Sequence, residues 1–147
     1  MLNIYVASSW KNNRYERIKK YLEEYGHKVM DWRESSTTFR WSDVDENYEN
    51  WTREKYIEII NTNEKTKQGF QKDLKLMQKA DVCVLLLPCG NSAHLEAGWF
   101  IGQNKPTFIL LEASQPNIIK PDLMYMLSNS ICKTVVELAT KLSEVQI

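Results

Sequence analysis

The chain has 147 residues, of which 43% are hydrophobic, and its 19 lysines and arginines balance its 19 aspartates and glutamates. This length and apolar content predict a single domain over residues 1–147 whose core needs neither disulfides nor a metal. Because a neutral chain has no net field that attracts polyanions, neither a nucleic acid polymer nor a membrane is expected as a partner.

The cysteines and the N-terminus bear on the compartment. Cys83, Cys89 and Cys132 are odd in number and not clustered, which argues against a disulfide framework. Cys83 lies in an apolar run and is expected to be buried. The start, MLNIYVASSW, lacks the basic and long apolar segments of a signal peptide, and no apolar run approaches the ~20 residues of a membrane span. These features predict a cytoplasmic protein.

The chain is expected to begin with a strand, a helix and a second strand. Residues 2–7 are an apolar run, residues 14–25 repeat apolar side chains at helical spacing before Gly26, and residues 27–32 form another short run. Such a unit takes a parallel, right-handed crossover.

Residues 34–66 form an aromatic-rich insert that is otherwise polar, with one helix expected at about 47–60. Because the insert is too long for a simple connection, it is either a lid or binding loop, or an extra helix that packs its aromatics on the core.

Strands and helices alternate in the rest of the chain. A helix over 67–79, with an apolar stripe of Phe70, Leu74 and Met77, precedes a wholly apolar strand over 81–88. The later expected elements are a helix over 92–103, a strand over 107–111, a loop over 112–122, a helical turn over 124–128, a weak strand over 130–133 and a helix over 134–145.

This alternation predicts an α/β protein with a flavodoxin-like, doubly wound, parallel five-stranded sheet and helices on both faces. Such sheets bind ligands beyond the carboxyl ends of their strands. The turns after residues 2–7 and 81–88 are therefore the first places to seek a site.

Glu96 is the first candidate for chemistry. It follows the apolar strand and its turn and is expected in about the first turn of the next helix, where the partial positive charge favours a carboxylate. Its neighbours are small or apolar, so an acid there is either functional or complements only the helix dipole.

Asp73 borders the apolar stripe of its helix and could face the same site, or be an ordinary acid paired with Lys72 or Lys75. Two acids in different surroundings can divide the roles of nucleophile and general acid.

The turn after the first strand contains Ser8, Ser9, Lys11 and Arg14, which could hold a phosphate or a ribose or could simply start a helix. The chain lacks the glycine motifs of dinucleotide-binding and P-loop sites, so no cofactor is expected. Cys89 and His94 without a second cluster do not make a zinc site, and no G-x-S-x-G elbow supports a serine triad.

The stretch ADVCVLLLPCGNSAHLEAGWFIGQNKPTFILL, from Ala80 to Leu111, resembles the nucleoside 2-deoxyribosyltransferase superfamily, which includes nucleoside deoxyribosyltransferases and nucleotide N-glycosidases. Residues 96–98, Glu-Ala-Gly, match the segment with the family's nucleophilic glutamate, and Asp73 matches its second acid. Residues 4–10, IYVASSW, resemble its first strand and sugar-binding turn. That turn lacks the glycine-rich, arginine-bearing form of the monophosphate hydrolases.

The resemblance implies cleavage or transfer of an N-glycosidic bond in a nucleoside or nucleotide. Glu96 would attack or stabilise the anomeric carbon and Asp73 would protonate or orient the base. It also implies a homo-oligomer in which a C-terminal segment completes a neighbour's site. The substrate-binding residues expected on this basis, and from the two turns, are Ser8, Ser9, Trp10, Gly90, Asn91, Ser92, Ser128 and Asn129.

Two alternatives stay open. The first is an NAD-cleaving domain similar to TIR domains, which also carry a helix-borne glutamate on a flavodoxin-like sheet, although their Trp-Cys pair before the glutamate is missing here. The second is an inactive nucleotide-binding or interaction module, because a fold does not by itself establish an activity.

Overall fold

The computed structural model describes residues 1–34, 38–112 and 119–147 and divides the chain into two compact units. The first unit contains residues 1–31 and 79–147, and the second contains residues 32–78. The predicted loop over 112–122 and the start of the insert fall partly outside the described residues. The single domain expected from the sequence stays a prediction.

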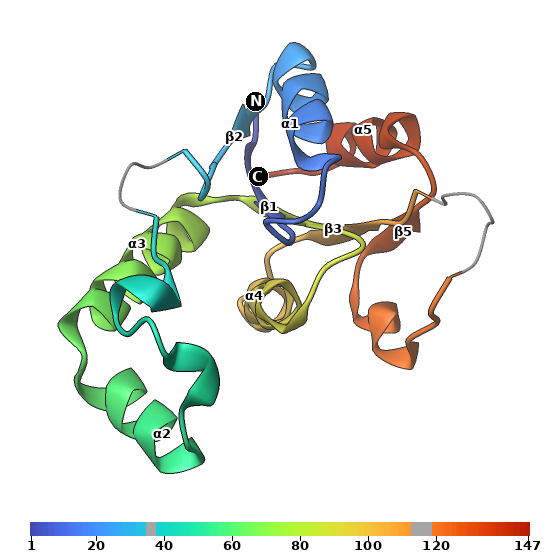
Figure 1. The fold of residues 1–147 in the computed structure, drawn as a ribbon. Coiled ribbons are helices and arrows are strands. Elements are labelled where there is room, and N and C mark those ends of the chain that lie inside the picture. The colour runs from blue at the N-terminus through green and yellow to red at the C-terminus, as the bar shows by residue number, and fades with distance from the viewer. Residues whose placement is uncertain (35–37, 113–118) are drawn as a thin grey trace. The chain divides into compact units, whose positions relative to one another are not determined.

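The first unit is built on a parallel five-stranded sheet in the order β2-β1-β3-β4-β5 (Figure 1). Its strands are β1 (Asn3–Ala7), β2 (Lys28–Val29), β3 (Val82–Leu86), β4 (Thr107–Leu110) and β5 (Ser130–Cys132). This is the flavodoxin-like order, so the predicted fold class is confirmed. The second strand is much shorter than residues 27–32.

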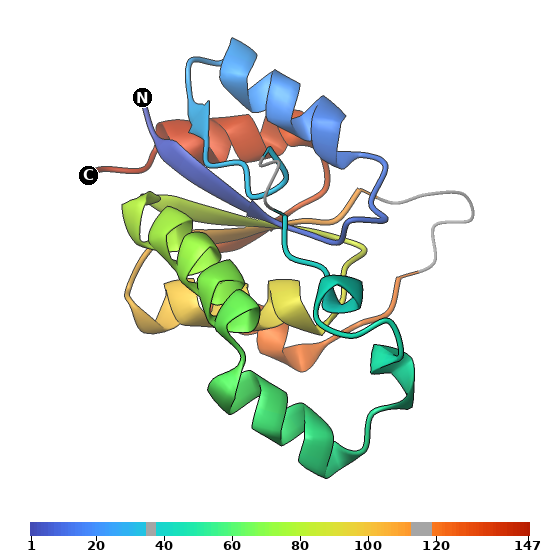
Figure 2. The ribbon, with the colours of Figure 1, turned by 60° about the vertical axis from the view of Figure 1, so that its left-hand side comes forward.

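Helices cover both faces of this sheet, with α1 (Tyr15–Glu24) and α5 (Val135–Ser143) on one face and α4 (Asn91–Gly102) on the other (Figure 2). The central strand β3 is buried along its whole length, which explains its uninterrupted apolar sequence. Tyr5 of β1 packs on Phe100 of α4 with ring centroids 5.6 Å apart. Gly26, at φ 85°, supplies the left-handed residue that follows α1.

The second unit holds most of the insert and nearly all of α3. Its elements are the short 3-10 helices η1 (Trp41–Asp43) and η2 (Tyr48–Asn50), the helix α2 (Arg53–Thr62) and α3 (Glu64–Lys79), whose last residue belongs to the first unit. The helix expected at 47–60 begins only at Arg53, because Trp51 is extended and the Thr52 hydroxyl caps the amide of Lys55 at 3.1 Å.

The aromatic side chains of the insert pack on one another. Trp41 makes edge-to-face contacts with Phe39, Trp51 and Tyr56, at centroid distances of 4.8, 5.7 and 6.0 Å. Gly69 of α3 lets Phe39 approach closely, since a Cβ there would lie 2.8 Å from the Cβ of Phe39. No residue of α2 is buried. In the predicted α3 stripe, Met77 is buried but Phe70 is exposed.

A third 3-10 helix, in the C-terminal third of the described chain, contributes to the site. The helix η3 (Leu123–Leu127) follows β4, and the Asp122 carboxylate accepts a hydrogen bond from the Met124 amide at its start. None of the described helices is long and apolar enough to cross a membrane.

Candidate functional site

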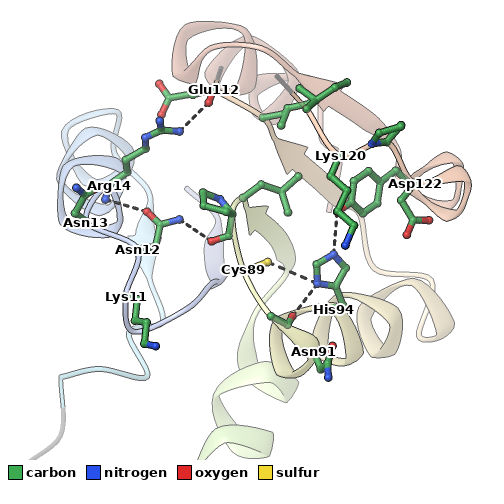
Figure 3. Close-up of a pocket in the computed structure, with 17 residues that line it drawn as sticks. Lys11, Asn12, Asn13, Arg14, Cys89, Asn91, His94, Glu112, Lys120 and Asp122 are labelled. Carbon is green, nitrogen blue, oxygen red and sulfur yellow. Dashed lines mark hydrogen bonds between the residues drawn. The ribbon is translucent and has the colours of Figure 1, made fainter. Parts of the chain in front are cut away.

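A cavity of about 690 Å³ lies at the carboxyl edge of the sheet, where the topology predicted a site. We call it the edge cavity. It is lined by three segments that follow β1, β3 and β4 (Figure 3). Its lining residues are Lys11, Asn12, Asn13, Arg14, Leu87, Pro88, Cys89, Gly90, Asn91, His94, Leu111, Glu112, Ile119, Lys120, Pro121, Asp122 and Tyr125.

Hydrogen bonds from Ser8 and Asn12 fix the turn after β1. The Ser8 hydroxyl is buried and donates to the Leu86 carbonyl at 2.9 Å, so it joins the ends of β1 and β3. The buried Asn12 amide donates to the Pro88 carbonyl at 3.2 Å, and its oxygen accepts from the Arg14 amide at 2.9 Å. The Ser8 hydroxyl is therefore used within the fold. The side chain of Trp10, the other candidate of this turn, is half exposed to solvent.

Ser9 has a local role in the same turn. Its hydroxyl oxygen accepts a hydrogen bond from the Lys11 amide at 3.2 Å, and its carbonyl accepts one from the Asn12 amide at 3.0 Å. Such short-range bonds are typical of serine in turns. They hold Lys11 and Asn12 where both line the edge cavity.

The start of α4 contributes Gly90 and Asn91 to the lining of the edge cavity. Gly90 is the extended cap residue before the helix, and the candidates Gly90, Asn91 and Ser92 are all exposed to solvent. Because glycine has no side chain, the cap leaves the first-turn amides open to a ligand. Ser92 is not among the described residues that line the edge cavity.

His94 joins α4 to η3 across one wall of the edge cavity. Its Nδ1 lies 2.8 Å from the Gly90 carbonyl oxygen and its Nε2 lies 2.9 Å from the Tyr125 hydroxyl (Figure 3). A carbonyl only accepts, so Nδ1 carries a proton, and in the neutral imidazole Nε2 accepts from the Tyr125 hydroxyl. Burial raises the pKa of Tyr125, with contributions from Cys89 and Asp122, which keeps its hydroxyl protonated.

The sequence did not predict that His94, Tyr125 and Lys120 line one cavity. His94 was considered there only as a zinc ligand, and that role was rejected. Tyr125 is 31 residues away and Lys120 precedes a short 3-10 helix, so no spacing rule connects them. The only usable signal was topological, because segments that follow neighbouring parallel strands meet at one edge. The described residues contain no group of three or more His, Cys, Asp or Glu side chains that could hold a metal ion.

Glu96 lies on α4 but is not among the described residues that line the edge cavity. It is the sixth residue of the helix, in the second turn, so the expected first-turn position is wrong. The helix began one residue earlier than predicted, and the dipole effect fades beyond the first turn. Its ionisation therefore depends on its surroundings.

The charge of Glu96 acts on two cysteines, Cys83 in β3 and Cys89 after that strand. The Oε2 atom of Glu96 is buried. Burial raises the pKa of Cys89 to about 11, and the negative charge of Glu96 adds to this shift. The same two causes raise the pKa of the wholly buried Cys83. Because Cys89 also lines the edge cavity, the field of Glu96 reaches that cavity wall.

Asp73 lies on α3 in the second unit and is partly buried. Burial raises the pKa of its carboxyl group, and the positive charge of Lys72 offsets part of that shift. The direction is that required of a carboxylic acid that donates a proton.

Asn129 lies at the amino end of β4, away from the carboxyl edge of the sheet, and Ser128 contacts Tyr125 of η3. The Asn129 side-chain oxygen accepts from the Thr107 amide at 2.8 Å, at the amino end of β4. The Ser128 hydroxyl donates to the Tyr125 carbonyl at 2.7 Å. The predicted role of Ser128 and Asn129 in a neighbour's site stays a prediction.

Solved structures with the same fold include two enzymes that act on nucleosides or nucleotides. A 2-deoxyribosyltransferase from Bacillus psychrosaccharolyticus matches with a TM-score of 0.59 and 18% identity, over 99% of this chain and 93% of that protein. The CMP N-glycosidase BcmB from Clostridium botulinum matches with a TM-score of 0.52 and 18% identity, over 96% and 98% of the two chains.

This chain has the nucleoside 2-deoxyribosyltransferase-like fold. A conserved protein from Enterococcus faecalis V583 shares it, with a TM-score of 0.63 and 13% identity over 98% of each chain. No protein-family profile matches the sequence, and no curated protein matches it. The 2-deoxyribosyltransferase-like resemblance in residues 80–111 is thus accompanied by a likeness of the whole fold.

Proposed function

We propose that this protein cleaves or transfers the N-glycosidic bond of a nucleoside or nucleotide, with Glu96 as the nucleophile. The observation that supports this most is the position of Glu96 on α4, directly after the central strand β3, with one carboxylate oxygen buried. The 2-deoxyribosyltransferase-like fold of solved enzymes that act on this bond adds support.

The proposed first step is displacement at the anomeric carbon. A Glu96 oxygen bonds to this carbon while the bond to the base nitrogen breaks, and the bonding electrons leave with the base. A buried carboxylate is poorly hydrated, which favours it as a nucleophile and as a stabiliser of the developing positive charge. The resulting ester holds the sugar and frees the base site.

In the second step an acceptor attacks the same carbon and Glu96 leaves as a carboxylate. Water as the acceptor gives the free sugar and loses a proton to the second acid, whereas another base gives a new nucleoside. The same machinery therefore supports hydrolysis or transfer, and access of water to the ester decides between them.

We assign the proton transfers to Asp73. Its pKa is raised by burial, so a larger fraction of the carboxyl is protonated near neutral pH than for an ordinary aspartate. A protonated Asp73 would donate to the departing base nitrogen and would take the proton back from the acceptor. These are the roles that the family resemblance implies for Asp73.

The decisive experiment is a substrate panel on wild type and on Glu96→Gln. Purified protein is incubated with ribo- and deoxyribonucleosides, their 5′-monophosphates and NAD, and free base or nicotinamide is measured by chromatography. We expect base release by wild type and a loss of at least about 100-fold in Glu96→Gln, because the amide is not a nucleophile. Glu23→Gln, an exposed acid on α1, should retain full activity.

Each other outcome contradicts the proposal in a distinct way. Nicotinamide release alone would indicate the NAD-cleaving alternative, and saturable binding without turnover would indicate a binding module. Base release that persists in a folded Glu96→Gln protein would remove Glu96 from the mechanism.

A further inference from the structure

Two cavities of the first unit meet at the side chains of His94 and Tyr125. Both side chains line the edge cavity of about 690 Å³, and both also line a second cavity of about 200 Å³. We call the second cavity the apolar pocket. Much of its lining is aliphatic and comes from β3, α4, β4 and η3: Leu85, Ala97, Ile101, Ile109 and Leu127. The pair therefore forms a wall between the polar edge cavity and an apolar space.

The apolar pocket is open beside α4, where Gly98 belongs to its lining. Apart from the chain neighbours of Gly98 and the backbone of its helix, no atom of the described residues lies within 4 Å of the position that a Cβ would take there. A glycine in the interior of a helix is less stable than an alanine, and no contact within the described chain requires it here. The pocket thus has space for a group that this chain does not supply.

His94 is fixed because both of its ring nitrogens are engaged (Figure 3). Nδ1 donates to the Gly90 carbonyl at 2.8 Å, and Nε2 lies 2.9 Å from the Tyr125 hydroxyl oxygen. The imidazole and phenol rings are inclined by only 19°, with centroids 5.8 Å apart. Since rotation of the imidazole would break both hydrogen bonds, the wall is held in place on its α4 side.

Tyr125 is fixed by bonds within η3. Its carbonyl oxygen accepts from the Ser128 amide at 3.1 Å and from the Ser128 hydroxyl at 2.7 Å. Asp122, which also lines both cavities, accepts from the Met124 amide at 2.8 Å at the start of the same element. The wall is therefore a fixed boundary, held from α4 and from η3, and a fixed boundary can select ligands by size.

We propose that His94 and Tyr125 are specificity-determining residues, which limit the ligands of the edge cavity by closing it against the apolar pocket. This inference rests on the proposed function for the ligand itself, a nucleoside or nucleotide. At the wall a ligand meets the polar edges of two rings, so a small polar group fits there and a bulky apolar substituent does not. Removal of either ring would join the two cavities, and an aryl substituent could then bury its surface in the apolar pocket.

The test is calorimetric titration with adenosine, cytidine and their 2′-deoxy forms, and with the same nucleosides carrying a benzyl group on the 5′ oxygen or on the amino nitrogen of the base. The proteins are wild type, Tyr125→Ala, His94→Ala, Tyr125→Phe and Tyr25→Ala. We expect wild type to bind each benzylated compound at least about tenfold more weakly than its parent. In both cavity-joining variants, Tyr125→Ala and His94→Ala, the ratio of benzylated to parent affinity should rise at least about tenfold for one of the two benzyl positions.

The control variants isolate the wall from other effects. Tyr125→Phe retains the ring and should retain the wild-type ratio, and so should Tyr25→Ala, since Tyr25 is exposed after α1 and lines neither cavity. A variant that is only destabilised lowers both affinities together and leaves their ratio unchanged.

The outcomes distinguish this inference from the proposed function. An unchanged ratio in both cavity-joining variants, or benzylated compounds bound by wild type as tightly as their parents, would overturn the wall, while base release that depends on Glu96 would leave the proposed function standing. The expected ratios without base release from any nucleoside or nucleotide would overturn the proposed function and leave the wall standing.

Discussion

At the scale of single residues, the position of an acid along its helix and the burial of its carboxyl group affect its charged form separately. Glu96 lies in the second turn of α4, where the helix dipole is weak. Its buried oxygen and its effect on the pKa of Cys89 instead distinguish it as a candidate for the site. Asp73 is marked instead by a pKa raised by burial. Groups perturbed in this way cluster at functional sites, where they cost stability.

Replacing Asp73 by Asn should stabilise the fold at neutral pH and slow base release. Because the folded-state pKa is raised, the folded chain binds more protons than the unfolded chain between the two pKa values, so stability falls as pH rises through that range. The gain in melting temperature should be full at about pH 7 and should vanish near pH 3, where both states are protonated.

Thermal unfolding at both pH values, together with base release at pH 7, checks this expectation. Glu23→Gln on α1 is the control, since it replaces an exposed acid. A melting temperature that falls at pH 7 in Asp73→Asn would contradict the assigned cost of its charge.

At the scale of elements, capping side chains decide where the helices begin. Thr52 caps α2, the Asn63 side chain accepts from the Thr66 amide at the start of α3, and Thr134 accepts from the Glu137 amide before α5. Because of the Thr52 cap, α2 begins at Arg53 and not near residue 47, where the sequence predicted its start. In α5 the predicted inward residues Val135, Leu138, Ala139 and Leu142 are all buried.

Thr134→Ala should lower the free energy of unfolding by about 1 kcal/mol, because it removes the hydroxyl that accepts from Glu137 at 3.1 Å. Thr140→Ala is the matched control, since Thr140 is exposed within the same helix and alanine favours a helix. Urea unfolding followed by circular dichroism compares them. Equal loss in both variants would show that the cap contributes nothing beyond the methyl and hydroxyl groups removed.

At the scale of the whole molecule, an exposed apolar surface in the first unit bears on assembly. Leu95 on α4 and Leu123, Met124 and Met126 on or beside η3 are all at least 60% exposed, and His94 and Tyr125 bond these two elements together. We call these four residues the η3 patch. Contiguous exposed apolar side chains mark interaction surfaces, so we propose that the predicted homo-oligomer forms here.

Met126→Glu should weaken self-association at least about tenfold, because it buries a charge in an apolar contact. Light scattering after size-exclusion chromatography over a dilution series measures this. Val136→Glu, at an exposed apolar position on α5, should leave the oligomer intact. A wild-type protein that is monomeric at about 100 μM would exclude the proposed assembly.

The sequence by itself determined the sheet, its central strand, the closing helix and the edge at which a cavity forms. These follow from local apolar patterns and from the handedness of strand–helix–strand units, which need no knowledge of distant residues. The resemblance of residues 80–111 also predicted the 2-deoxyribosyltransferase-like fold that solved structures share.

Only the tertiary structure decided which side chains line the edge cavity. His94, Tyr125 and Lys120 are brought to one wall from segments separated in the chain, while the predicted Ser8 is used between strands and Asn129 lies at the opposite edge. The physical reason is that side-chain direction and hydrogen-bond partners depend on long-range packing, whereas the order of elements is encoded locally.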